Sequence, residues 1–594
     1  MQGNEPMRLV ADIETNGLLR QDSPVIHCLV TQDLDTGQVF CYDDKGGEND
    51  TIVTGIKYLM SADEVWGHNW IGFDTQFIRE LYPFYKPEGK VYDTLIMSRL
   101  FFTDMLNRDF RSKPANMPAN LYGRHSLESW GYRLGHYKSE FGKTTDWSEY
   151  SPEMLEYCKQ DVAVSAELCN LFSSKLEQYA DCIETEHKIA EIMCWQEREG
   201  WPFDERKAQE LESKLRAELD LLSDEMRDTF HMVDGGSFTP KRNNQTKGYV
   251  EGATMSRLRE FSPTSRSHIA WAFQNYRGWK PRDLTDTGRP KIDEKILMEI
   301  GTDESKKFAR ILTLQKHLGQ LSEGNGSWLK SSVRGKIHHS CVLATNTGRM
   351  AHMRINAAQV PSGREYRELF GPGPRRVQVG ADASGLELRV LGGFMYRFDG
   401  GKFATEVVEG DIHTKLQHIY GVPTRSASKP VTYALIYGAG NHKLGLTAGA
   451  DDKTATAKGK EIRSNIMTNL DGFKDLMEAV ARRAETDVLK GLDGRPIRLM
   501  GQKFRALNYI CQSAGAVICK LWVIRTHELL KAAGLDYHPL GFIHDEQQLS
   551  VHPDHAEQAA KLLVDAMRDV QKQINFRCEL DAESVIGESW ADCH

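Results

Sequence analysis

Two aspartates that each follow a short apolar run constrain this chain more than any other feature. Residues 377–381 (VQVGA) lead into Asp382. Residues 541–543 (GFI) are followed by His544 and Asp545. Runs of this length and composition predict short buried strands. A buried carboxylate is costly unless a cation offsets its charge, and divalent cations prefer carboxylate oxygens. The pair therefore indicates neighbouring strands that present a two-metal site for phosphoryl transfer.

Length and composition favour a soluble protein of several domains. The chain has 594 residues, 40% hydrophobic and 27% charged, which is too long for one core and predicts roughly three or four domains. The N-terminus has no apolar signal region, and the longest apolar run, residues 514–524, is broken by Lys520. We therefore expect no membrane association. The eleven cysteines are scattered without CxxC pairs, which indicates reduced thiols in a cytosolic compartment.

The formal net charge of −8 argues mildly against a nucleic-acid binder. Residues 334–376 differ from this average, because they carry eight lysines and arginines against only Glu365 and Glu368. Such a surplus just before the Asp382 strand suits contact with phosphates. A solvated charged face is the alternative.

The order of sequence patterns predicts separate regions along the chain. Strand-like and helix-like runs alternate over about residues 7–175, as in an α/β domain. Two helical patterns cover about residues 185–230, with Asp204 as a candidate N-cap of the second. Residues 231–265 are polar and rich in Gly, Lys, Arg and Asn, which predicts an exposed loop or a mobile insertion.

A second group of carboxylates lies near the N-terminus. Asp12 and Glu14 share one face of a predicted strand. Asp74 follows, and Tyr157 and Asp161 are four apart on one predicted helix face. Three aspartates, one glutamate and a tyrosine can hold two Mg²⁺ ions and orient a water for attack on a phosphodiester. A lone Asp-x-Glu is more often a solvated strand end.

In this order, the set resembles the DEDD proofreading exonucleases of the subtype with tyrosine before the last aspartate. The resemblance implies that Tyr157 positions the attacking water. It also implies a set of metal ligands: Asp12, Glu14, Asp74 and Asp161.

A stripe of side chains at four-residue spacing follows Asp382. Arg425, Lys429, Tyr433 and Tyr437 fall on one helix face. Two cations followed by two aromatic rings suit a triphosphate at one end and a sugar or base at the other. The alternative is an amphipathic helix that packs its tyrosines into a core. Pro430 lies inside this helix and is expected to kink it.

Three motifs together resemble motifs A, B and C of the family-A DNA polymerases: DASGLELR from Asp382, the Arg425 helix, and HDE from His544. TGR at residues 347–349 and residues 508–520 match further family elements. The resemblance covers nearly the whole chain and is greatest to the replicative polymerases of short-tailed phages.

The resemblance implies a multidomain α/β and α+β fold, with an RNase H-like exonuclease domain and a right-hand polymerase. The expected boundaries are 1–180 for the exonuclease, 185–340 for a mainly helical thumb, 341–395 for the first palm segment, 396–500 for the fingers and 501–594 for the second palm segment.

The resemblance also implies roles in polymerisation. Asp382 and Asp545 carry two metal ions with the Ala383 carbonyl, and Glu546 supports that site. The triphosphate is held by Arg425, Lys429 and His413, and Lys429 can also protonate the leaving group. Tyr433 packs against the sugar, Glu387 partners it and excludes a 2′ hydroxyl, and Tyr437 lines the templating base. The expected DNA contacts are Arg349, Asn508, Gln512 and His544.

The expected function is DNA-dependent DNA synthesis with 3′–5′ proofreading in the replication of a phage genome. Expected cofactors are two Mg²⁺ ions per active site, for which Mn²⁺ can substitute. Expected partners are primer–template DNA, dNTPs, a phage helicase-primase and a single-strand binding protein, in the cytoplasm of the bacterial host. Related phage enzymes can carry a long thumb insertion that binds host thioredoxin, but residues 230–261 are only about 30 residues. No thioredoxin-type factor is therefore expected.

Three other classes of function remain as alternatives. One is a binding scaffold on a decayed polymerase fold, although the costly carboxylates of both clusters are present. Another is an RNA polymerase or reverse transcriptase with a related palm. Glu387 and the exonuclease-like region argue against this alternative. The last is an exonuclease alone, which leaves Asp382, Asp545 and the cationic helix unexplained.

Overall fold

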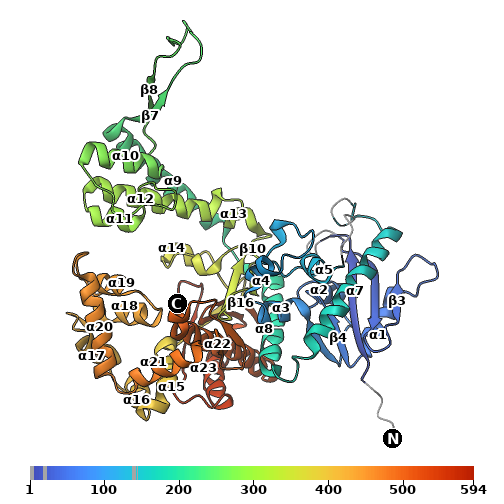
Figure 1. Cartoon of the computed structure of the whole chain (residues 1–594). Coiled ribbons are helices and arrows are strands. Elements are labelled where there is room, and N and C mark those ends of the chain that lie inside the picture. Colours follow the sequence, from blue (N-terminus) through green and yellow to red (C-terminus); the bar gives the residue numbers. More distant parts are fainter. Residues whose placement is uncertain (1–5, 18–22, 137–141, 143–144, 594) are drawn as a thin grey trace. The chain divides into compact units, whose positions relative to one another are not determined.

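The computed structural model describes residues 6–17, 23–136, 142 and 145–593. The chain divides into two compact units (Figure 1). The larger unit contains Met1–Trp201, His339–Val360 and Pro372–His594. The smaller unit contains Pro202–His338 and Pro361–Gly371.

The larger unit begins with a five-stranded sheet in the order β3-β2-β1-β4-β5. Its strands are β1 (Arg8–Thr15), β2 (Ile26–Asp33), β3 (Val39–Tyr42), β4 (Glu64–Gly67) and β5 (Lys90–Asp93). The first three form an antiparallel meander, while β4 and β5 run parallel to β1. The helical segments before β4 and β5 supply the long connections that parallel strands require.

Helices cover this sheet and fix which side each β1 residue faces. Leu9, Ala11 and Ile13 pack in one cluster with α1 (Ile52–Met60), while Val10 packs in another with α7 (Pro152–Ser173). Because side chains alternate along a strand, Asp12 and Glu14 share the side of Val10 and face α7. The remaining helices of this region are α2 (Asp74–Leu81), α3 (Thr94–Phe101), α4 (Met105–Ser112), η1 (Ala119–Leu121) and α5 (Leu127–Leu134).

A second, antiparallel sheet lies in the C-terminal part of the larger unit, in the order β16-β17-β13-β18. Its strands are β13 (Val377–Ala383), β16 (Tyr537–Ile543), β17 (Glu546–Val551) and β18 (Ala582–Gly587). Helix α23 (Ala556–Gln573) packs on β13 and β18, and α22 (Ala506–Ala532) packs on α23. Lys503–Ala532 is long and apolar enough to cross a membrane, but most of it is buried inside the protein. Burial in a large core accounts for its composition.

Between β13 and β16 the chain is mainly helical. The helices are α15 (Leu386–Asp399), α16 (Lys402–Val408), α17 (Ile412–Tyr420), α18 (Arg425–Ile436), α19 (Asn441–Thr447), α20 (Ala455–Asn469) and α21 (Phe473–Ala484). A small hairpin of β14 (Val488–Lys490) and β15 (Pro496–Arg498), then η4 (Lys503–Arg505), lead into α22. Helix α8 (Ala180–Glu199) packs on α22, β16 and β11 (Ser340–Leu343), which pairs with β12 (Met350–Met353).

The packing of α8 differs from the predicted boundary at residue 185, since the units divide after Trp201. The sequence pattern joined α8 to α9 (Glu205–Phe230) because both are helical, whereas their burial partners differ. All eleven cysteines are free thiols, as expected.

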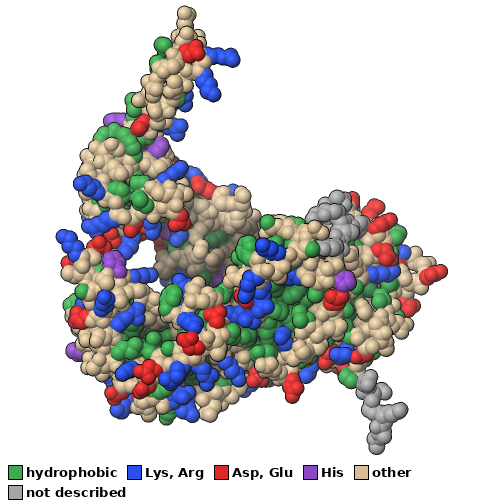
Figure 2. All heavy atoms as spheres, viewed as in Figure 1, with side chains coloured by type: hydrophobic (Ala, Val, Ile, Leu, Met, Phe, Trp, Pro, Cys, Tyr) green, Lys and Arg blue, Asp and Glu red, His purple; other side chains and the backbone are tan. Residues whose placement is uncertain are grey.

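The smaller unit is built on α9, α10 (Arg266–Arg277), α11 (Glu294–Ile300) and α12 (Asp303–Leu318). Asp204 caps α9 by accepting the backbone N–H of Lys207 at 2.9 Å, as predicted. Within the expected exposed loop at 231–265, β7 (Met232–Phe238) and β8 (Met255–Glu260) pair as a β-hairpin, and residues 239–254 form the long connection between them. Lys and Arg side chains gather on this hairpin (Figure 2). Its short alternating runs were hidden by the polar residues at its tip.

Candidate active sites

Strand pairing brings Asp382 and Asp545 together. β13 pairs with β17 so that Asp382 lies opposite Glu546. His544 and Asp545 form the turn between β16 and β17, with His544 at φ 58°. The backbone N–H of Ala383, the last residue of β13, donates to the carbonyl oxygen of Asp545 at 3.0 Å. The apolar run 541–543 lies in β16, and β17 separates it from β13. The expectation that the two runs are neighbouring strands is therefore wrong, and the turn after β16 brings Asp545 beside Asp382.

The two carboxylates differ in exposure. Asp382 is exposed and Asp545 is partly buried, so the expectation of two buried carboxylates is wrong for Asp382, which lies where β13 emerges from the sheet. Partial burial, with Asp382 and Glu387 nearby, raises the pKa of Asp545 to about 7. A divalent cation would offset this clustered negative charge, and these oxygen donors are the type that Mg²⁺ prefers.

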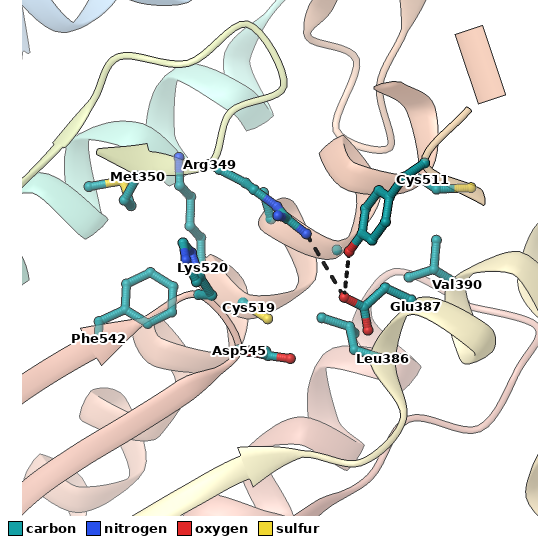
Figure 3. A pocket seen from close by; sticks show the side chains of 14 residues that line it. Arg349, Met350, Leu386, Glu387, Val390, Cys511, Cys519, Lys520, Phe542 and Asp545 are labelled. Carbon is teal, nitrogen blue, oxygen red and sulfur yellow. Dashed lines mark hydrogen bonds and ion pairs between the residues drawn. The ribbon is translucent and has the colours of Figure 1, made fainter. Parts of the chain in front are cut away.

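A cavity of about 210 Å³ adjoins Asp545. Figure 3 shows Glu387 beside Asp545, with Arg349 directed toward Glu387. The lining of the cavity comes from α15, α18, α22 and the β16–β17 hairpin, with Arg349 preceding β12. Elements far apart in the sequence therefore converge on one site.

Glu387 is held by two neighbours. The Tyr437 hydroxyl donates to Oε1 of Glu387 at 3.0 Å, and Nη2 of Arg349 lies 4.0 Å from the same oxygen. Burial and the nearby Glu387 charge raise the pKa of Tyr437. The sequence expectation named Tyr433 as the partner of Glu387, whereas the hydrogen bond in this structure comes from Tyr437, one helical turn further on.

The aromatic end of the stripe lies beside the carboxylates. The rings of Tyr433 and Tyr437 stack with centroids 6.5 Å apart. Burial raises the pKa of Tyr433, with smaller contributions from the charges of Glu387 and Asp545. Nδ2 of Asn508 donates to the Tyr437 carbonyl at 3.2 Å, which ties α22 to the end of α18. Gln512 lies one turn after Asn508 on α22 and is partly buried.

The cationic end of the stripe is exposed. Nε of Arg425 donates to both oxygens of Asp411, at 3.0 and 2.8 Å. Lys429 is exposed, and His413 is partly buried at the start of α17. Burial lowers the pKa of His413, and the charges of Lys429 and Arg425 lower it further. Three of the predicted triphosphate ligands thus lie together.

Pro430 does not interrupt this helix, which runs unbroken from Arg425 to Ile436. The predicted loss of one backbone hydrogen bond is tolerated because side chains support neighbouring turns. The Ser428 hydroxyl lies 2.7 Å from the Arg425 carbonyl oxygen, and the Thr432 hydroxyl donates to the Ser428 carbonyl at 2.8 Å.

Glu546 is buried next to the C-terminal segment. Nε1 of Trp590 donates to Oε1 of Glu546 at 2.5 Å, and Nε2 of Gln548 donates to the same oxygen at 2.6 Å. Because successive strand residues face opposite sides, Asp545 and Glu546 point apart. These bonds give Glu546 a supporting place in the structure. His594, the last residue of the chain, lies outside the described residues.

The basic segment at 334–376 is not one surface. Residues 334–338 and 361–371 belong to the smaller unit, and the rest belongs to the larger. Arg354 pairs with Glu197, and Nη1 of Arg376 lies 3.0 Å from Asp536. These two arginines hold elements of the larger unit together in this structure, and phosphate contact by this segment stays a prediction.

The N-terminal carboxylates meet where β1 faces α7. One ligand atom from each of Asp12, Glu14 and Cys158 lies within 4.8 Å of the others. Oδ1 of Asp74 accepts the backbone N–H of Ile13 at 3.2 Å. Burial, then the Asp12 charge, raises the pKa of Asp74 well above its ordinary value.

The last two predicted members of this cluster come from α7. Tyr157 is partly buried, and Asp161, one turn later, is buried. Their neighbour Cys158 donates its thiol to the Asp12 carbonyl oxygen at 3.3 Å, which brings this turn of α7 against β1. Oxygen donors at this density suit hard divalent cations.

Comparison with known proteins agrees with this geometry. Residues 240–592 match the family model described as DNA polymerase family A. The chain belongs to DNA polymerase family A.

Among relatives of this family-A chain, the DNA-directed DNA polymerase of Enterobacteria phage T3 is 32% identical over 99% of this chain and 100% of the relative. The enzyme of Escherichia phage T7 is 31% identical with the same coverage. The POL domain of Pol1 from M. smegmatis, solved in complex with DNA primer-template and dNTP, has a TM-score of 0.73 at 15% identity, covering 99% of this chain and 96% of that one. This last likeness supports the family-A fold.

Sequence reasoning missed a buried ionic cluster beside the family-A site. Nζ of Lys520 lies 2.6 Å from Oε1 of Glu186, and Nη1 of Arg495 lies 2.7 Å from the same oxygen. Arg495 also pairs with Asp493 at 2.6 Å. All four are buried, and Lys520 lines the cavity. A lysine inside an apolar helix run was the available signal, because a buried charge requires a partner.

Proposed function

We propose that this family-A chain is a DNA-directed DNA polymerase with 3′–5′ proofreading that replicates a phage genome. The observation that carries the proposal is the meeting of Asp382 and Asp545 at one end of the β13–β17 pair, next to the Glu387–Tyr437 hydrogen bond. The full-length relatives from phages T3 and T7 are named as DNA-directed DNA polymerases, which supports the same activity here.

The polymerase roles follow from the position of each group. Asp382, Asp545 and the Ala383 carbonyl would hold two Mg²⁺ ions. When bound, such ions lower the pKa of a primer 3′ hydroxyl and neutralise charge on the leaving pyrophosphate. Arg425, Lys429 and His413 bind the triphosphate, for which Arg425 must exchange Asp411 for phosphate oxygens.

The residues at the other end of the nucleotide select and align it. Tyr433 packs against the sugar, and Glu387 occupies the space that a 2′ hydroxyl would need. Tyr437 lines the templating base and keeps Glu387 in place through their hydrogen bond. Arg349, Asn508, Gln512 and His544 bind primer–template DNA around the cavity.

The proofreading activity belongs to the N-terminal sheet. Strand order β3-β2-β1-β4-β5, with β2 antiparallel to β1, supports the expected RNase H-like fold. The carboxylates of Asp12, Glu14, Asp74 and Asp161 would hold metal ions, and Tyr157 orients a water. Clustered acids with a raised pKa at Asp74 support a site that takes up cations.

The proposed partners are primer–template DNA, dNTPs, a phage helicase-primase and a single-strand binding protein, in the cytoplasm of a bacterial host. The structure solved with primer-template and dNTP, which shares this fold, supports the first two.

The test is primer extension and single-strand degradation with Mg²⁺ by three proteins. Asp12→Ala with Glu14→Ala should abolish degradation of single-stranded 3′ ends and leave synthesis intact. Asp545→Ala should abolish synthesis and leave degradation intact. Loss of both activities in either folded variant would contradict a two-site enzyme. Efficient extension with ribonucleotides would instead favour an RNA polymerase.

A further inference from the structure

A cluster of sulfur and nitrogen ligands lies outside the two carboxylate sites. One ligand atom from each of His339, Cys341 and His352 lies within 4.8 Å of the others. Sγ of Cys341 is 3.2 Å from Nδ1 of His352. His339 and Cys341 are buried and His352 is partly buried. Neither activity proposed above uses these three side chains.

The backbone fixes this cluster in place. Cys341 and His352 are directly opposite each other in the β11–β12 pair. His339 precedes Cys341 by two residues, a spacing that repeats the same face of an extended chain. The His339 ring packs between Trp201, at 5.9 Å between centroids, and His352, at 6.4 Å. The three side chains are therefore already ordered, so binding of a common ligand costs little further side-chain entropy.

Helix α8 closes the cluster. Nε2 of Gln196 lies 3.0 Å from Nε2 of His339 and 3.8 Å from Sγ of Cys341. The next residue, Glu197, bonds to Ser340 and Arg354, which flank the cluster on the two strands. The Gln196 amide thus sits at the position where a shared ligand would contact both side chains.

The two ring nitrogens of His352 differ, because Nδ1 is the one beside Sγ of Cys341. Nε2 of His352 is buried and has no hydrogen-bond partner among residues 6–17, 23–136, 142 and 145–593. Burial also lowers the pKa of His352 to about 4. An unpaired buried nitrogen is costly unless something binds it.

We infer that His339, Cys341 and His352 form a binding site for a thiophilic divalent cation of the Zn²⁺ class. Two imidazoles and one thiolate are a ligand set that Zn²⁺ favours, with bonds of about 2.0–2.1 Å to nitrogen and about 2.3 Å to sulfur. The 3.2 Å between Sγ of Cys341 and Nδ1 of His352 already suits two ligands of one such ion. Binding releases the Cys341 thiol proton to solvent, and Gln196 turns away or supplies its oxygen as a fourth ligand.

The proposed cation site contacts the strand and the turn that position Asp545. Sγ of Cys341 lies 3.9 Å from the carbonyl oxygen of Phe542 in β16, and the His352 ring is 5.8 Å from the His544 ring. A cation that reorients Cys341 or His352 therefore acts on the strand and the ring next to Asp545. On the proposed function, Zn²⁺ bound here slows DNA synthesis through displacement of the primer-side contacts.

The binding test uses Co²⁺ as a spectroscopic probe with the full chain in reducing buffer. The wild-type protein should give a thiolate-to-cobalt charge-transfer band with tetrahedral ligand-field bands at one equivalent, and Zn²⁺ should displace it. Cys341→Ser should lose this band, and His352→Gln should weaken Co²⁺ binding at least about 100-fold. The matched control is Cys158→Ser, which removes the thiol beside Asp12 and Glu14 and should keep the band.

Absence of a thiolate band in the wild-type protein would overturn the inference, whether or not the variants fold. So would a band that survives Cys341→Ser and disappears in Cys158→Ser, because the cation would then sit at the N-terminal carboxylates. In primer extension with excess Mg²⁺, Cys341→Ser should need at least about tenfold more Zn²⁺ for half inhibition. The spectra test the cation site even if the chain makes no DNA.

Discussion

The hydroxyl of Tyr437 donates to Oε1 of Glu387 across 3.0 Å, joining the end of α18 to the start of α15. Arg349 approaches the same oxygen to 4.0 Å. Glu387 is therefore held by a helix that carries proposed triphosphate ligands and by an arginine proposed to contact DNA. The position of Glu387 therefore depends on elements that contact each proposed substrate, the nucleotide and the DNA.

Selection against ribonucleotides should depend on this bond. Glu387→Ala should lower the ratio of kcat/KM for dNTP over rNTP about 100-fold, and Tyr437→Phe about tenfold, because a hydrogen bond to a charged group contributes about 1.5–3 kcal/mol. Single-nucleotide incorporation measures both ratios. Tyr396→Phe, a change at an exposed tyrosine, serves as control. An unchanged ratio in Glu387→Ala would contradict the exclusion role.

Dideoxynucleotide use should depend on the Tyr433 hydroxyl. Tyr433→Phe should reduce dideoxynucleotide incorporation about tenfold relative to dNTP, since one hydrogen bond is lost where a sugar hydroxyl is missing. Competition between the two nucleotides in a sequencing-type extension measures this. Equal incorporation by both proteins would show that the Tyr433 hydroxyl has no such role.

Asp545 should make stability depend on pH and Mg²⁺. Its folded pKa of about 7 lies above the ordinary 3.8, so between these values the native state binds more protons than the unfolded state. Its contribution to stability therefore falls as pH rises from about 4 to about 7 and is constant above that. Asp545→Asn should remove this decline without Mg²⁺, raising Tm by a few degrees at pH 8 and little at pH 4.

Mg²⁺ should raise the Tm of the wild-type protein more at pH 8 than at pH 5, since only the ionised carboxylate binds it. Thermal unfolding of both proteins, with and without Mg²⁺, measures these shifts. Asp554→Asn, at an exposed side chain, controls for loss of one negative charge. Equal pH dependence in wild type and Asp545→Asn would contradict the raised pKa.

The Glu186 cluster should be sensitive to loss of a single member. Lys520→Met should destabilise the larger unit by about 3–5 kcal/mol, because Glu186 is then a buried charge with fewer partners. Lys520→Met with Glu186→Gln should be less destabilised than Lys520→Met alone. Lys188→Met in the exposed pair with Glu184 should change stability by at most about 1 kcal/mol. Calorimetry compares wild type, Lys520→Met, Glu186→Gln, their double variant and Lys188→Met, and additive effects of the two buried substitutions would argue against coupling.

Added thioredoxin should not lengthen the products of single-hit primer extension. The thumb stretch proposed for such a factor is here the short β7–β8 hairpin, while alignment with the T7 relative extends over 713 positions, so that relative has segments which this chain lacks. The measurement is product length with and without thioredoxin in excess. A large increase would contradict this prediction.

Local sequence patterns predicted much of this fold. The strands before Asp382 and Asp545, the helix from Arg425 and the Asp204 cap follow from periodicity and capping chemistry, which act over a few residues. Pro430 was expected to disturb its helix, but the hydroxyls of Ser428 and Thr432 support the same turns. The β7–β8 hairpin was missed because its strands are short and mostly exposed.

Contacts between distant residues could not be predicted from the sequence. Lys520 and Glu186 are 334 positions apart, and the local sequence around either residue does not indicate the other as its partner. The same is true of Glu387 with Tyr437, because the sequence analysis named Tyr433 as the partner and the hydrogen bond comes from Tyr437, one helical turn further on. Burial of Cys158 against Asp12 likewise depends on the packing angle of α7 on β1.

Helix α8 has a practical consequence for dissecting the protein. Its N-terminal half supplies Glu186 to Lys520, and its last turn supplies Gln196 to His339 and Glu197 to Ser340 and Arg354. A shortened protein meant to retain only the C-terminal activity should therefore start before Ala180. Truncation at Trp201 would remove Glu186, leaving Arg495 with Asp493 alone and the buried Lys520 cation without its carboxylate. Such a fragment should be insoluble even though every proposed catalytic group of the polymerase site is present.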